Sequence, residues 1–227
     1  MPIPTDTTAV VFDLDGTLID SADDLGAAAN RLLAAEERRP LSDAEVRQFI
    51  GDGSRVFVQR AWAATGATAP DGDLDGDLDG LVARFVAEYE SDVAGHTRPY
   101  PGAIETVRRL KSAGLKIAVC TNKPQRPAEM VLERLGFAAH LDAVAGGDRF
   151  AYRKPDPRHL EETMRLLGAT ADRTVMVGDN EHDMAVAQGA GTGAVLVTYG
   201  YARTPLAEID ADARIDTLDR LPGLLRI

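Results

Sequence analysis

The stretch Ala9-Val10-Val11-Phe12-Asp13-Leu14-Asp15-Gly16-Thr17 opens with four apolar residues and closes with two aspartates and a Gly-Thr pair. The short, β-branched apolar run predicts a fully buried strand. Two carboxylates at the end of such a strand are unfavourable unless a cation or a proton compensates them. The stretch therefore favours a metal-dependent catalytic site at a strand end. An ordinary acidic turn stays open at this point, because Asp and Gly are common turn residues.

The remainder of the chain alternates between helical and strand patterns. Helices are expected at residues 25–33, 43–50, 55–64, 81–93, 104–113, 127–135, 157–167 and 183–188. No strand is expected between residues 18 and 98, and further strands are expected at residues 116–120, 143–145, 174–177, 194–198 and 213–215. Strands that alternate with helices predict right-handed βαβ units and a parallel, Rossmann-like α/β sheet.

An all-helical insert follows the first strand and separates it from the others. An insert at this point would lie over the carboxyl end of the strand, where open α/β sheets bind ligands. We therefore expect a catalytic core of residues 1–19 and 96–227 and a small helical cap domain of residues 20–95.

Polar residues end one expected strand after another. Asp13 follows the first strand, Thr121 follows the strand at 116–120, and Asp179 follows the strand at 174–177. Lys154 lies in the loop after residues 143–145. Because the carboxyl ends of parallel strands meet at one edge of a sheet, we expect these side chains to converge on one crevice.

The chemistry of the converging residues is coherent. The carboxylates of Asp13, Asp15 and Asp179 would form the all-oxygen environment that Mg²⁺ prefers. The Thr121 hydroxyl and the Lys154 ammonium would donate to phosphate oxygens. Phosphoryl transfer needs mainly positioning, a cation and charge-neutralising donors, and an aspartate can act as its covalent nucleophile.

The composition narrows the function classes. A formal net charge of −11 argues against a nucleic-acid or anionic-membrane surface, since both need clustered Lys and Arg. The single cysteine, Cys120, ends an apolar run and is expected to be a small buried core residue. No intrachain disulfide is possible, and no segment has the pattern of a signal peptide or a membrane span. We therefore expect a cytoplasmic protein, monomeric or homodimeric.

Taken together, these motifs resemble those of the haloacid dehalogenase superfamily of phosphohydrolases over nearly the whole chain. The resemblance is carried by Asp13-Leu14-Asp15-Gly16-Thr17, Thr121, Lys154, Gly178-Asp179 and Asp183. Within the superfamily, the sequence is similar to the phosphoglycolate phosphatases in the segments Leu18-Ile19-Asp20-Ser21, Thr121-Asn122-Lys123-Pro124, Lys154-Pro155-Asp156-Pro157 and Thr198-Tyr199-Gly200-Tyr201. Asn180 departs from the expected pattern, in which Ser or Thr follows the Gly-Asp pair.

The resemblance implies a Mg²⁺-dependent hydrolase of small anionic phosphomonoesters that works through an aspartyl phosphate. Its first candidate substrate is 2-phosphoglycolate, and the alternative is another small metabolite such as a sugar phosphate or pyrophosphate. Asp13 would be the nucleophile and a metal ligand. Asp15 would be the general acid/base, and its backbone carbonyl would touch the metal. Asp179 would bind the metal directly, and Asp183 would be an outer ligand or orient Lys154. The residues expected to contact substrate are Gly16, Thr17, Thr121, Asn122 and Lys154.

Other activities fit the sequence less well. Haloacid dehalogenases proper lack an acid/base aspartate at the position of Asp15. Phosphonate hydrolases and hexose-phosphate mutases of this superfamily use a cap lysine, and residues 20–95 contain none. A non-enzymatic phospho-receiver module carries its phosphorylated aspartate later in the chain and has no helical insert. Phosphate release in the presence of Mg²⁺ separates these classes.

Two interpretations of Arg55 stay open. It follows the loop Gly51-Asp52-Gly53, so its guanidinium could bind a substrate carboxylate, or it could begin a solvent-facing helix. The hypothesis of carboxylate recognition would be refuted by an unchanged KM for 2-phosphoglycolate in Arg55→Ala. His182 is expected to face solvent or to pack on its own helix. The acidic residues 71–80 are expected to form a solvated loop between two cap helices.

Overall fold

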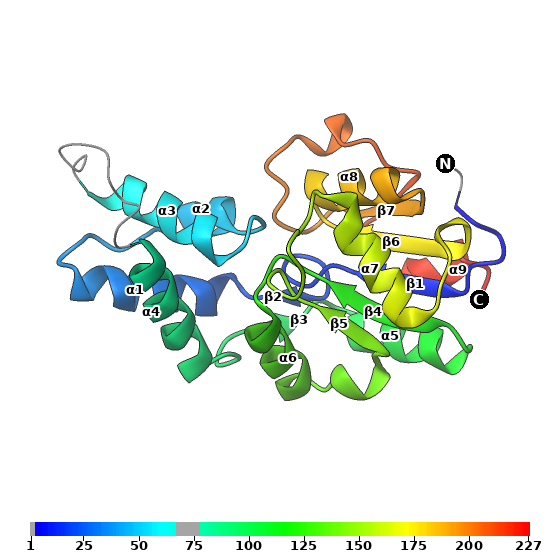
Figure 1. Cartoon of the computed structure of the whole chain (residues 1–227), viewed down its shortest axis with the longest axis horizontal. Coiled ribbons are helices and arrows are strands. Elements are labelled where there is room, and N and C mark those ends of the chain that lie inside the picture. Colours follow the sequence, from blue (N-terminus) through cyan, green and yellow to red (C-terminus); the bar gives the residue numbers. More distant parts are fainter. Residues whose placement is uncertain (1–2, 67–77) are drawn as a thin grey trace.

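The computed structural model describes residues 3–66 and 78–227, which form two lobes (Figure 1). One lobe is a sheet flanked by helices, and the other is built from helices alone. Most of the acidic segment at residues 71–80 lies outside the described residues. Among the helices that are described, none combines the length and the apolar character needed to cross a membrane.

The sheet lobe contains six parallel strands in the order β5-β4-β1-β6-β7-β8. This order places β1 centrally and sends the chain outward first on one side and then on the other, as in Rossmann-like folds. The predicted α/β fold is confirmed, and each of these strands begins and ends within one residue of its expected bounds. The strands are β1 (Ala9–Phe12), β4 (Lys116–Cys120), β5 (Ala143–Ala145), β6 (Thr174–Gly178), β7 (Gly193–Val197) and β8 (Ala213–Ile215).

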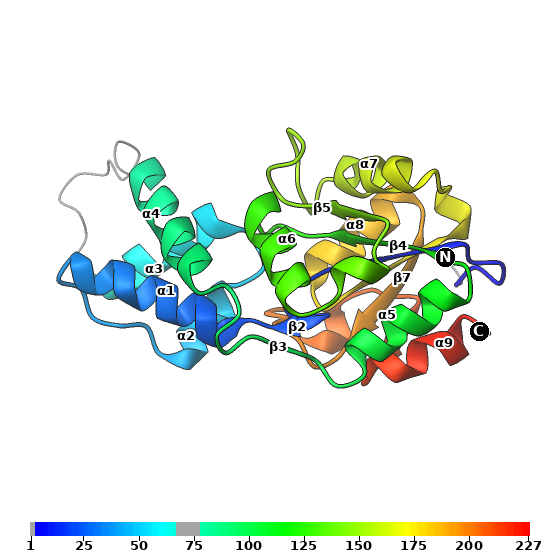
Figure 2. The ribbon, with the colours of Figure 1, turned by 90° about the horizontal axis from the view of Figure 1, so that it is seen from below.

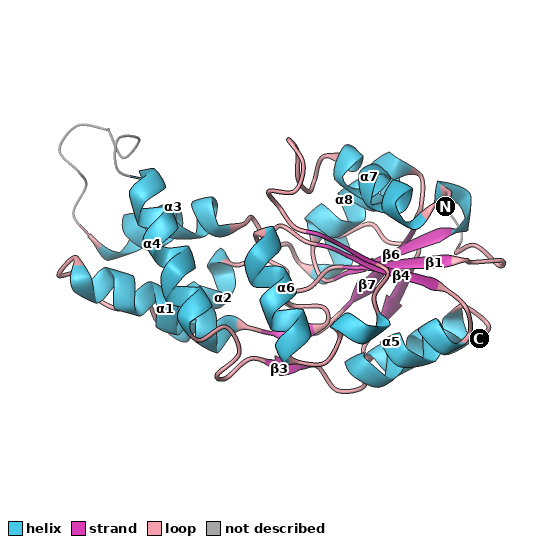
Figure 3. Ribbon diagram, turned by 60° about the horizontal axis from the view of Figure 1, so that its bottom comes forward, coloured by secondary structure: helices cyan, strands magenta, loops and turns pink. Residues whose placement is uncertain are grey.

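Helices cover both faces of this sheet (Figure 3). Successive side chains of a strand point to opposite faces, so β1, apolar throughout, is buried on both. Val10 and Phe12 pack with α5, α6 and α9, whereas Ala9 and Val11 pack with α7 and α8. These helices are α5 (Ala103–Ser112), α6 (Gln125–Arg134), α7 (Pro157–Leu167), α8 (Glu181–Ala190) and α9 (Leu221–Leu224). Short 3₁₀ helices span Ala138–His140, Ala171–Arg173, Leu206–Glu208 and Leu218–Arg220.

The helical lobe has a hydrophobic cluster of its own. The rings of Phe57 and Phe85 stack within it, with centroids 5.2 Å apart. Ser42 and Glu45 form a capping box that fixes the start of its second helix. The lobe consists of α1 (Ala22–Ala35), α2 (Asp43–Phe49), α3 (Ser54–Thr65) and α4 (Leu78–Ser91).

Two short strands connect the lobes, where the sequence analysis expected none. β2 (Ile19–Asp20) pairs antiparallel with β3 (Arg98–Pro99), below the main sheet in Figure 2. Two residues are too few to produce an alternating pattern, and Asp and Pro are both depleted in strands. Asp24 of α1 reinforces this connection, because its carboxylate accepts from the Thr97 N–H at 2.7 Å and from the Thr97 hydroxyl at 2.6 Å.

Candidate active site

Three neighbouring strands, β4, β1 and β6, end at the edge of the sheet that faces the helical lobe (Figure 1). Asp13 directly follows β1, and its N–H donates to the Val177 carbonyl of β6 at 2.8 Å. Thr121 directly follows β4, and its N–H donates to the Ala145 carbonyl at 3.0 Å. Asp179 directly follows β6. The parallel topology therefore brings residues from three distant parts of the chain to one edge.

Three carboxylates and one ammonium group form a buried cluster at this edge. Oxygens of Asp13, Asp179 and Asp183 lie within 4.8 Å of one another. The Lys154 Nζ lies 2.6 Å from Asp13 Oδ1 and 2.7 Å from Asp183 Oδ1. Each of the four residues is no more than 4% exposed. We call this group the carboxylate cluster.

One lysine does not neutralise this cluster. Burial, together with the nearby Asp183, raises the pKa of Asp13 to about 7 against the opposing effect of Lys154. Burial, then Asp183 and Asp13, raises the pKa of Asp179 well above its usual value. A further positive charge would stabilise the ionised carboxylates, and an all-oxygen donor set suits Mg²⁺. The residues present therefore fit a divalent cation.

Backbone N–H groups fix the orientation of two of the carboxylates. Asp179 Oδ2 accepts from the Tyr201 N–H at 2.5 Å, and Asp179 Oδ1 accepts from Asn180 Nδ2 at 3.0 Å. Asp183 Oδ2 accepts from the N–H groups of Asp179 and Asn180, which completes the capping box of α8. Gly16 has a φ of 93°, and a Cβ at this position would overlap the Asp179 carboxylate. The turn after β1 therefore requires glycine there.

Asp15 lies beside the carboxylate cluster and has separate partners. Its Oδ1 accepts from the Ser21 hydroxyl at 2.5 Å and lies 3.0 Å from the Lys123 Nζ, which is 3.2 Å from Oδ2. The Lys123 Nζ also lies 4.2 Å from the centroid of the Tyr89 ring. The sequence predicted no role for Lys123, which was named only as part of the segment Thr121-Asn122-Lys123-Pro124. Its position directly after Thr121 and Asn122, in a chain with four lysines, was the signal that could have identified it.

An open cleft lies between the lobes, and Asp13 and Asp15 line it. Gly16 and Thr17 are not among its described lining residues: Thr17 is fully buried, and the Tyr199 hydroxyl donates to its carbonyl at 2.8 Å. These two residues shape the turn behind the cleft instead of facing it. The sheet lobe contributes Asp13, Asp15, Thr121, Asn122, Lys123, Pro124 and Pro127, and the helical lobe contributes Leu25, Ile50, Gly51, Gly53, Ser54, Phe57, Phe85, Val86 and Tyr89.

Arg55 lies away from this cleft. It sits in the first turn of α3, its guanidinium pairs with Asp79 of α4, and its side chain is 42% exposed. It is absent from the lining within the described part of the chain. The interpretation of Arg55 as the start of a solvent-facing helix therefore describes the structure, and the hypothesis that Arg55 binds a substrate carboxylate does not fit it.

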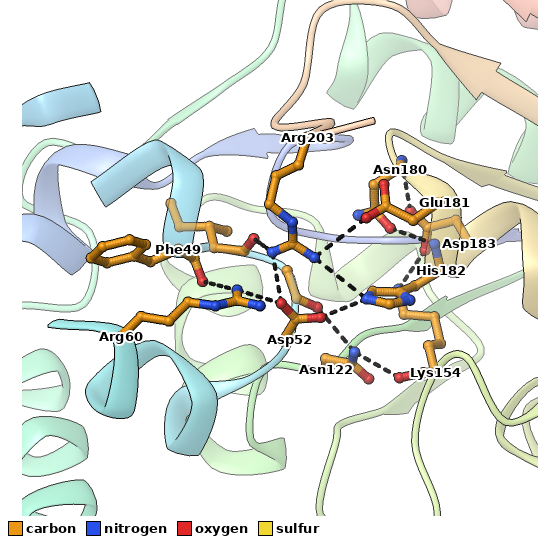
Figure 4. A network of polar contacts seen from close by, with 12 residues as sticks. Phe49, Asp52, Arg60, Asn122, Lys154, Asn180, Glu181, His182, Asp183 and Arg203 are labelled. Carbon is orange, nitrogen blue, oxygen red and sulfur yellow. Dashed lines mark hydrogen bonds and ion pairs between the residues drawn. The ribbon is translucent and has the colours of Figure 1, made fainter. Parts of the chain in front are cut away.

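Asp52 joins the helical lobe to the sheet lobe (Figure 4). It lies in the loop between α2 and α3 and accepts from Arg203 Nη1 at 2.6 Å, while His182 Nε2 lies 2.5 Å from its other oxygen. Arg60 of the helical lobe also pairs with it. Burial opposes ionisation, but hydrogen bonds from His182 and Arg203 hold the pKa of Asp52 far below its usual value. The expectation that His182 faces solvent or packs only on its own helix was wrong.

Two further contacts join the helical lobe to the sheet lobe. Asn122 Nδ2 donates to the Gly51 carbonyl of the helical lobe and to the Lys154 carbonyl, both at 3.0 Å (Figure 4). The Tyr201 hydroxyl accepts from the Ser21 N–H at 2.9 Å, at the start of α1. Because Tyr201 also binds Asp179 through its N–H, the same segment touches the carboxylate cluster and the helical lobe. Contacts of this kind join residues far apart in sequence, so no local sequence pattern predicts them.

His159 of α7 gives the stability of the protein a pH dependence of its own. The ring is fully buried; its Nδ1 accepts from the Lys154 N–H at 3.2 Å, and its Nε2 has no partner in the described chain. Burial, and then the charge of Lys154, lower its pKa to about 4. An unfolded histidine titrates near 6.5, so the unfolded state binds more protons between pH 6.5 and 4. The free energy of unfolding therefore falls as the pH falls through this window.

His159→Gln is expected to remove that pH dependence. The free energy of unfolding of the wild type should lose up to about 3 kcal/mol more than that of the variant between pH 7 and pH 4. Urea unfolding at half-unit pH steps measures the difference, with His140→Gln as the matched control. Parallel curves for wild type and His159→Gln would show that the buried imidazole does not have a lowered pKa.

Comparison with known proteins adds to this geometry. Residues 7–191 match the family described as haloacid dehalogenase-like hydrolases. The chain is 44% identical to a phosphoglycolate phosphatase of Mesorhizobium japonicum, over 93% of this chain and 92% of that protein. It is 40% identical to a phosphoglycolate phosphatase of Agrobacterium fabrum, over 95% and 91% of the two chains. The crystal structure of a predicted phosphoglycolate phosphatase from Haemophilus somnus superposes with a TM-score of 0.90 at 28% identity, covering 96% of this chain and 98% of that one.

Proposed function

The chain belongs to the haloacid dehalogenase-like hydrolases and is a phosphoric monoester hydrolase, and from this premise we propose that it hydrolyses 2-phosphoglycolate to glycolate and phosphate. The observation that carries the proposal is the carboxylate cluster, in which Asp13 contacts Lys154 and also lines a cleft between two lobes. The names of the relatives support the choice of substrate. We assign the catalytic core to residues 1–19 and 96–227 and the cap domain to residues 20–95.

In the proposed reaction, a carboxylate oxygen of Asp13 attacks phosphorus, the bond from phosphorus to the glycolate oxygen breaks, and an aspartyl phosphate forms. Asp15 donates a proton to the leaving oxygen. Asp15 then takes a proton from a water molecule, whose oxygen attacks the same phosphorus and releases phosphate from Asp13. Both aspartates return to their starting state. Ser21 and Lys123 hold the Asp15 carboxylate in place for these two proton transfers.

Donors around Asp13 would bind the phosphoryl group. Thr121 and Asn122 follow β4 and line the cleft. The Thr121 hydroxyl and the Asn122 N–H would donate to phosphoryl oxygens, and Lys154 would offset their charge. The apolar residues of the helical lobe would exclude bulk water from the cleft, which strengthens each of these interactions.

Four residues are proposed to hold the cation. Asp13 and Asp179 would bind Mg²⁺ through their carboxylates and Asp15 through its backbone carbonyl, while Asp183 would be an outer ligand that also orients Lys154. When bound, the cation supplies positive charge that stabilises the phosphoryl oxygens during transfer.

Phosphate release from a panel of small phosphomonoesters tests the proposed substrate. The panel contains 2-phosphoglycolate, glucose 6-phosphate, glyceraldehyde 3-phosphate and pyrophosphate, each assayed with MgCl₂. The proposal expects the highest kcat/KM for 2-phosphoglycolate. A higher kcat/KM for a sugar phosphate or for pyrophosphate would contradict the substrate while leaving the phosphatase chemistry in place.

Removal of divalent cations is expected to abolish turnover, because Lys154 alone does not neutralise the three carboxylates of the cluster. Dialysis against EDTA should stop phosphate release, and added MgCl₂ should restore it. A second readout is the melting temperature, which a hundredfold excess of Mg²⁺ over its Kd should raise by roughly 5–10 °C, since the ion binds the folded state. Asp179→Asn should lose this shift. Full activity in EDTA would contradict the metal assignment.

A further inference from the structure

The cleft contains one positively charged side chain that the proposed catalytic roles leave largely unexplained. Lys123 is the only cation among the described residues that line it, and its side chain is 4% exposed. A buried ammonium needs compensating negative charge, which Asp15 supplies in part. Lysine carries three N–H donors, so its ammonium can serve Asp15 and a second carboxylate at the same time.

Tyr89 places an unused donor beside this lysine. It lines the cleft from α4, is 2% exposed, and its ring lies 4.2 Å from the Lys123 Nζ. Its hydroxyl is buried and donates no hydrogen bond within the part of the chain that the structure describes. A buried hydroxyl without an acceptor is unfavourable, so this position favours a ligand that brings an acceptor oxygen.

Apart from Tyr89, the helical lobe lines the cleft with apolar residues and with the N-terminal end of a helix. Ser54 lines the cleft at the start of α3, whose first turn carries no acidic side chain and whose N-cap, Gly53, makes no side-chain cap. The positive end of a helix dipole favours an anion at such a place. Phe57 and Phe85, on the same side, offer no competing charge. Besides Asp13 and Asp15, the cleft therefore combines a cation, a free hydroxyl donor and a helix N-terminus with the apolar residues of the helical lobe.

We propose that Lys123 and Tyr89 form a carboxylate-binding subsite next to Asp15, which selects phosphomonoesters whose leaving alcohol carries a carboxylate. The assignment rests on the proposed function, because it takes Asp15 as the donor to the leaving oxygen. In 2-phosphoglycolate the carboxylate is attached to the carbon that bears this oxygen. A substrate whose leaving oxygen meets Asp15 therefore brings its carboxylate to the partner of Asp15, which is Lys123.

The subsite also explains how the cleft could recognise glycolate without Arg55. Arg55 is engaged with Asp79 outside the cleft, whereas Lys123 reaches it from the loop after β4. Lys123 would thus bind the substrate carboxylate from the sheet lobe, directly beside the reacting atoms. Tyr89 would donate a second hydrogen bond to it from the helical lobe.

Comparison of two substrates of equal chain length tests the subsite. The kcat/KM for 2-phosphoglycolate is divided by that for ethyl phosphate, which lacks the carboxylate. Lys123→Gln is expected to lower this ratio about 100-fold, because a site built for a charged group loses that discrimination. Tyr89→Phe should lower it about 5-fold, and Lys123→Arg should keep most of it. Lys116→Gln, an exposed lysine at the other end of β4, should leave it unchanged.

The possible outcomes distinguish a failure of the proposed subsite from a failure of the proposed function on which it rests. Equal losses with both substrates in Lys123→Gln, in a wild type that prefers 2-phosphoglycolate, would mean that Lys123 only positions Asp15 and would overturn the subsite alone. A wild type that hydrolyses ethyl phosphate as well as 2-phosphoglycolate would contradict both. Thermal melts of each variant accompany the kinetics, and Tyr89→Phe, which removes one hydroxyl and keeps the ring, provides the test if Lys123→Gln does not fold.

Discussion

Asp13→Asn is expected to abolish turnover of phosphomonoesters while the protein stays folded. The amide keeps the shape of the side chain but cannot attack phosphorus, so the proposed covalent step is lost. We expect kcat to fall by at least about four orders of magnitude, as for other covalent nucleophiles. Phosphate release measured at saturating 2-phosphoglycolate and MgCl₂ gives this value.

The fold should tolerate this change because it relieves charge repulsion. In the wild type, Asp13 lies close to Asp179 and Asp183, and Lys154 retains Asp183 as a partner when Asp13 is neutral. The melting temperature of Asp13→Asn without Mg²⁺ should therefore equal or exceed that of the wild type. Asp172→Asn, an exposed aspartate before β6 at the opposite edge of the sheet, serves as the control and should keep full activity. Retained activity in Asp13→Asn would remove the basis for the nucleophile assignment.

Lys154→Met should have the second largest effect and should lower both activity and stability. The variant leaves the three carboxylates of the cluster without their cation, in a site that is almost fully buried. Removing one partner of a buried ion pair costs about 3–5 kcal/mol of unfolding free energy. Loss of a donor to the phosphoryl group should reduce kcat about 10²- to 10³-fold. Urea unfolding in EDTA and steady-state kinetics with MgCl₂ measure the two effects.

A double variant separates the two roles of Lys154. Lys154→Met combined with Asp183→Asn removes one of the uncompensated carboxylates, so it should recover part of the stability but none of the activity. Lys111→Met is the matched control, because this lysine pairs with Asp142 near the surface, and its loss should cost within about 1 kcal/mol. If Lys154→Met kept wild-type stability in EDTA, the electrostatic description of the carboxylate cluster would be wrong.

The sheet and the position of the cluster could be predicted from the sequence because both depend on local patterns. The apolar runs at β1, β4 and β6 set the strands, and parallel topology then places Asp13, Thr121 and Asp179 at one edge. The pair of β2 and β3 was missed because two residues carry no periodicity. The sequence left the direction of Arg55 open, since a residue in the first turn of a helix can point to either side.

The contacts between the lobes lay beyond the reach of sequence patterns. Lys123 and Asp15 are 108 residues apart, and Asp52 and His182 are 130 apart. The sequence around each of these side chains contains no motif that indicates its partner. Asp52 and His182 come together only because the helical lobe lies against the edge of the sheet. His182 shows this clearly, because its helix gives no indication that its ring faces a carboxylate of another lobe.

The covalent step at Asp13 is the central claim, and trapping the intermediate tests it most directly. Wild type and Asp15→Asn, which lacks the proposed base for the second step, are mixed with 2-phosphoglycolate carrying ³²P and MgCl₂, quenched in acid within milliseconds and digested. The account predicts acid-stable, base-labile label on the peptide that contains Asp13 in the wild type. In Asp15→Asn, which lacks both the proposed acid of the first step and the proposed base of the second, it predicts slower formation and slower loss of this label. Turnover in the wild type with no label on that peptide in either protein, or with label on another residue, would contradict it.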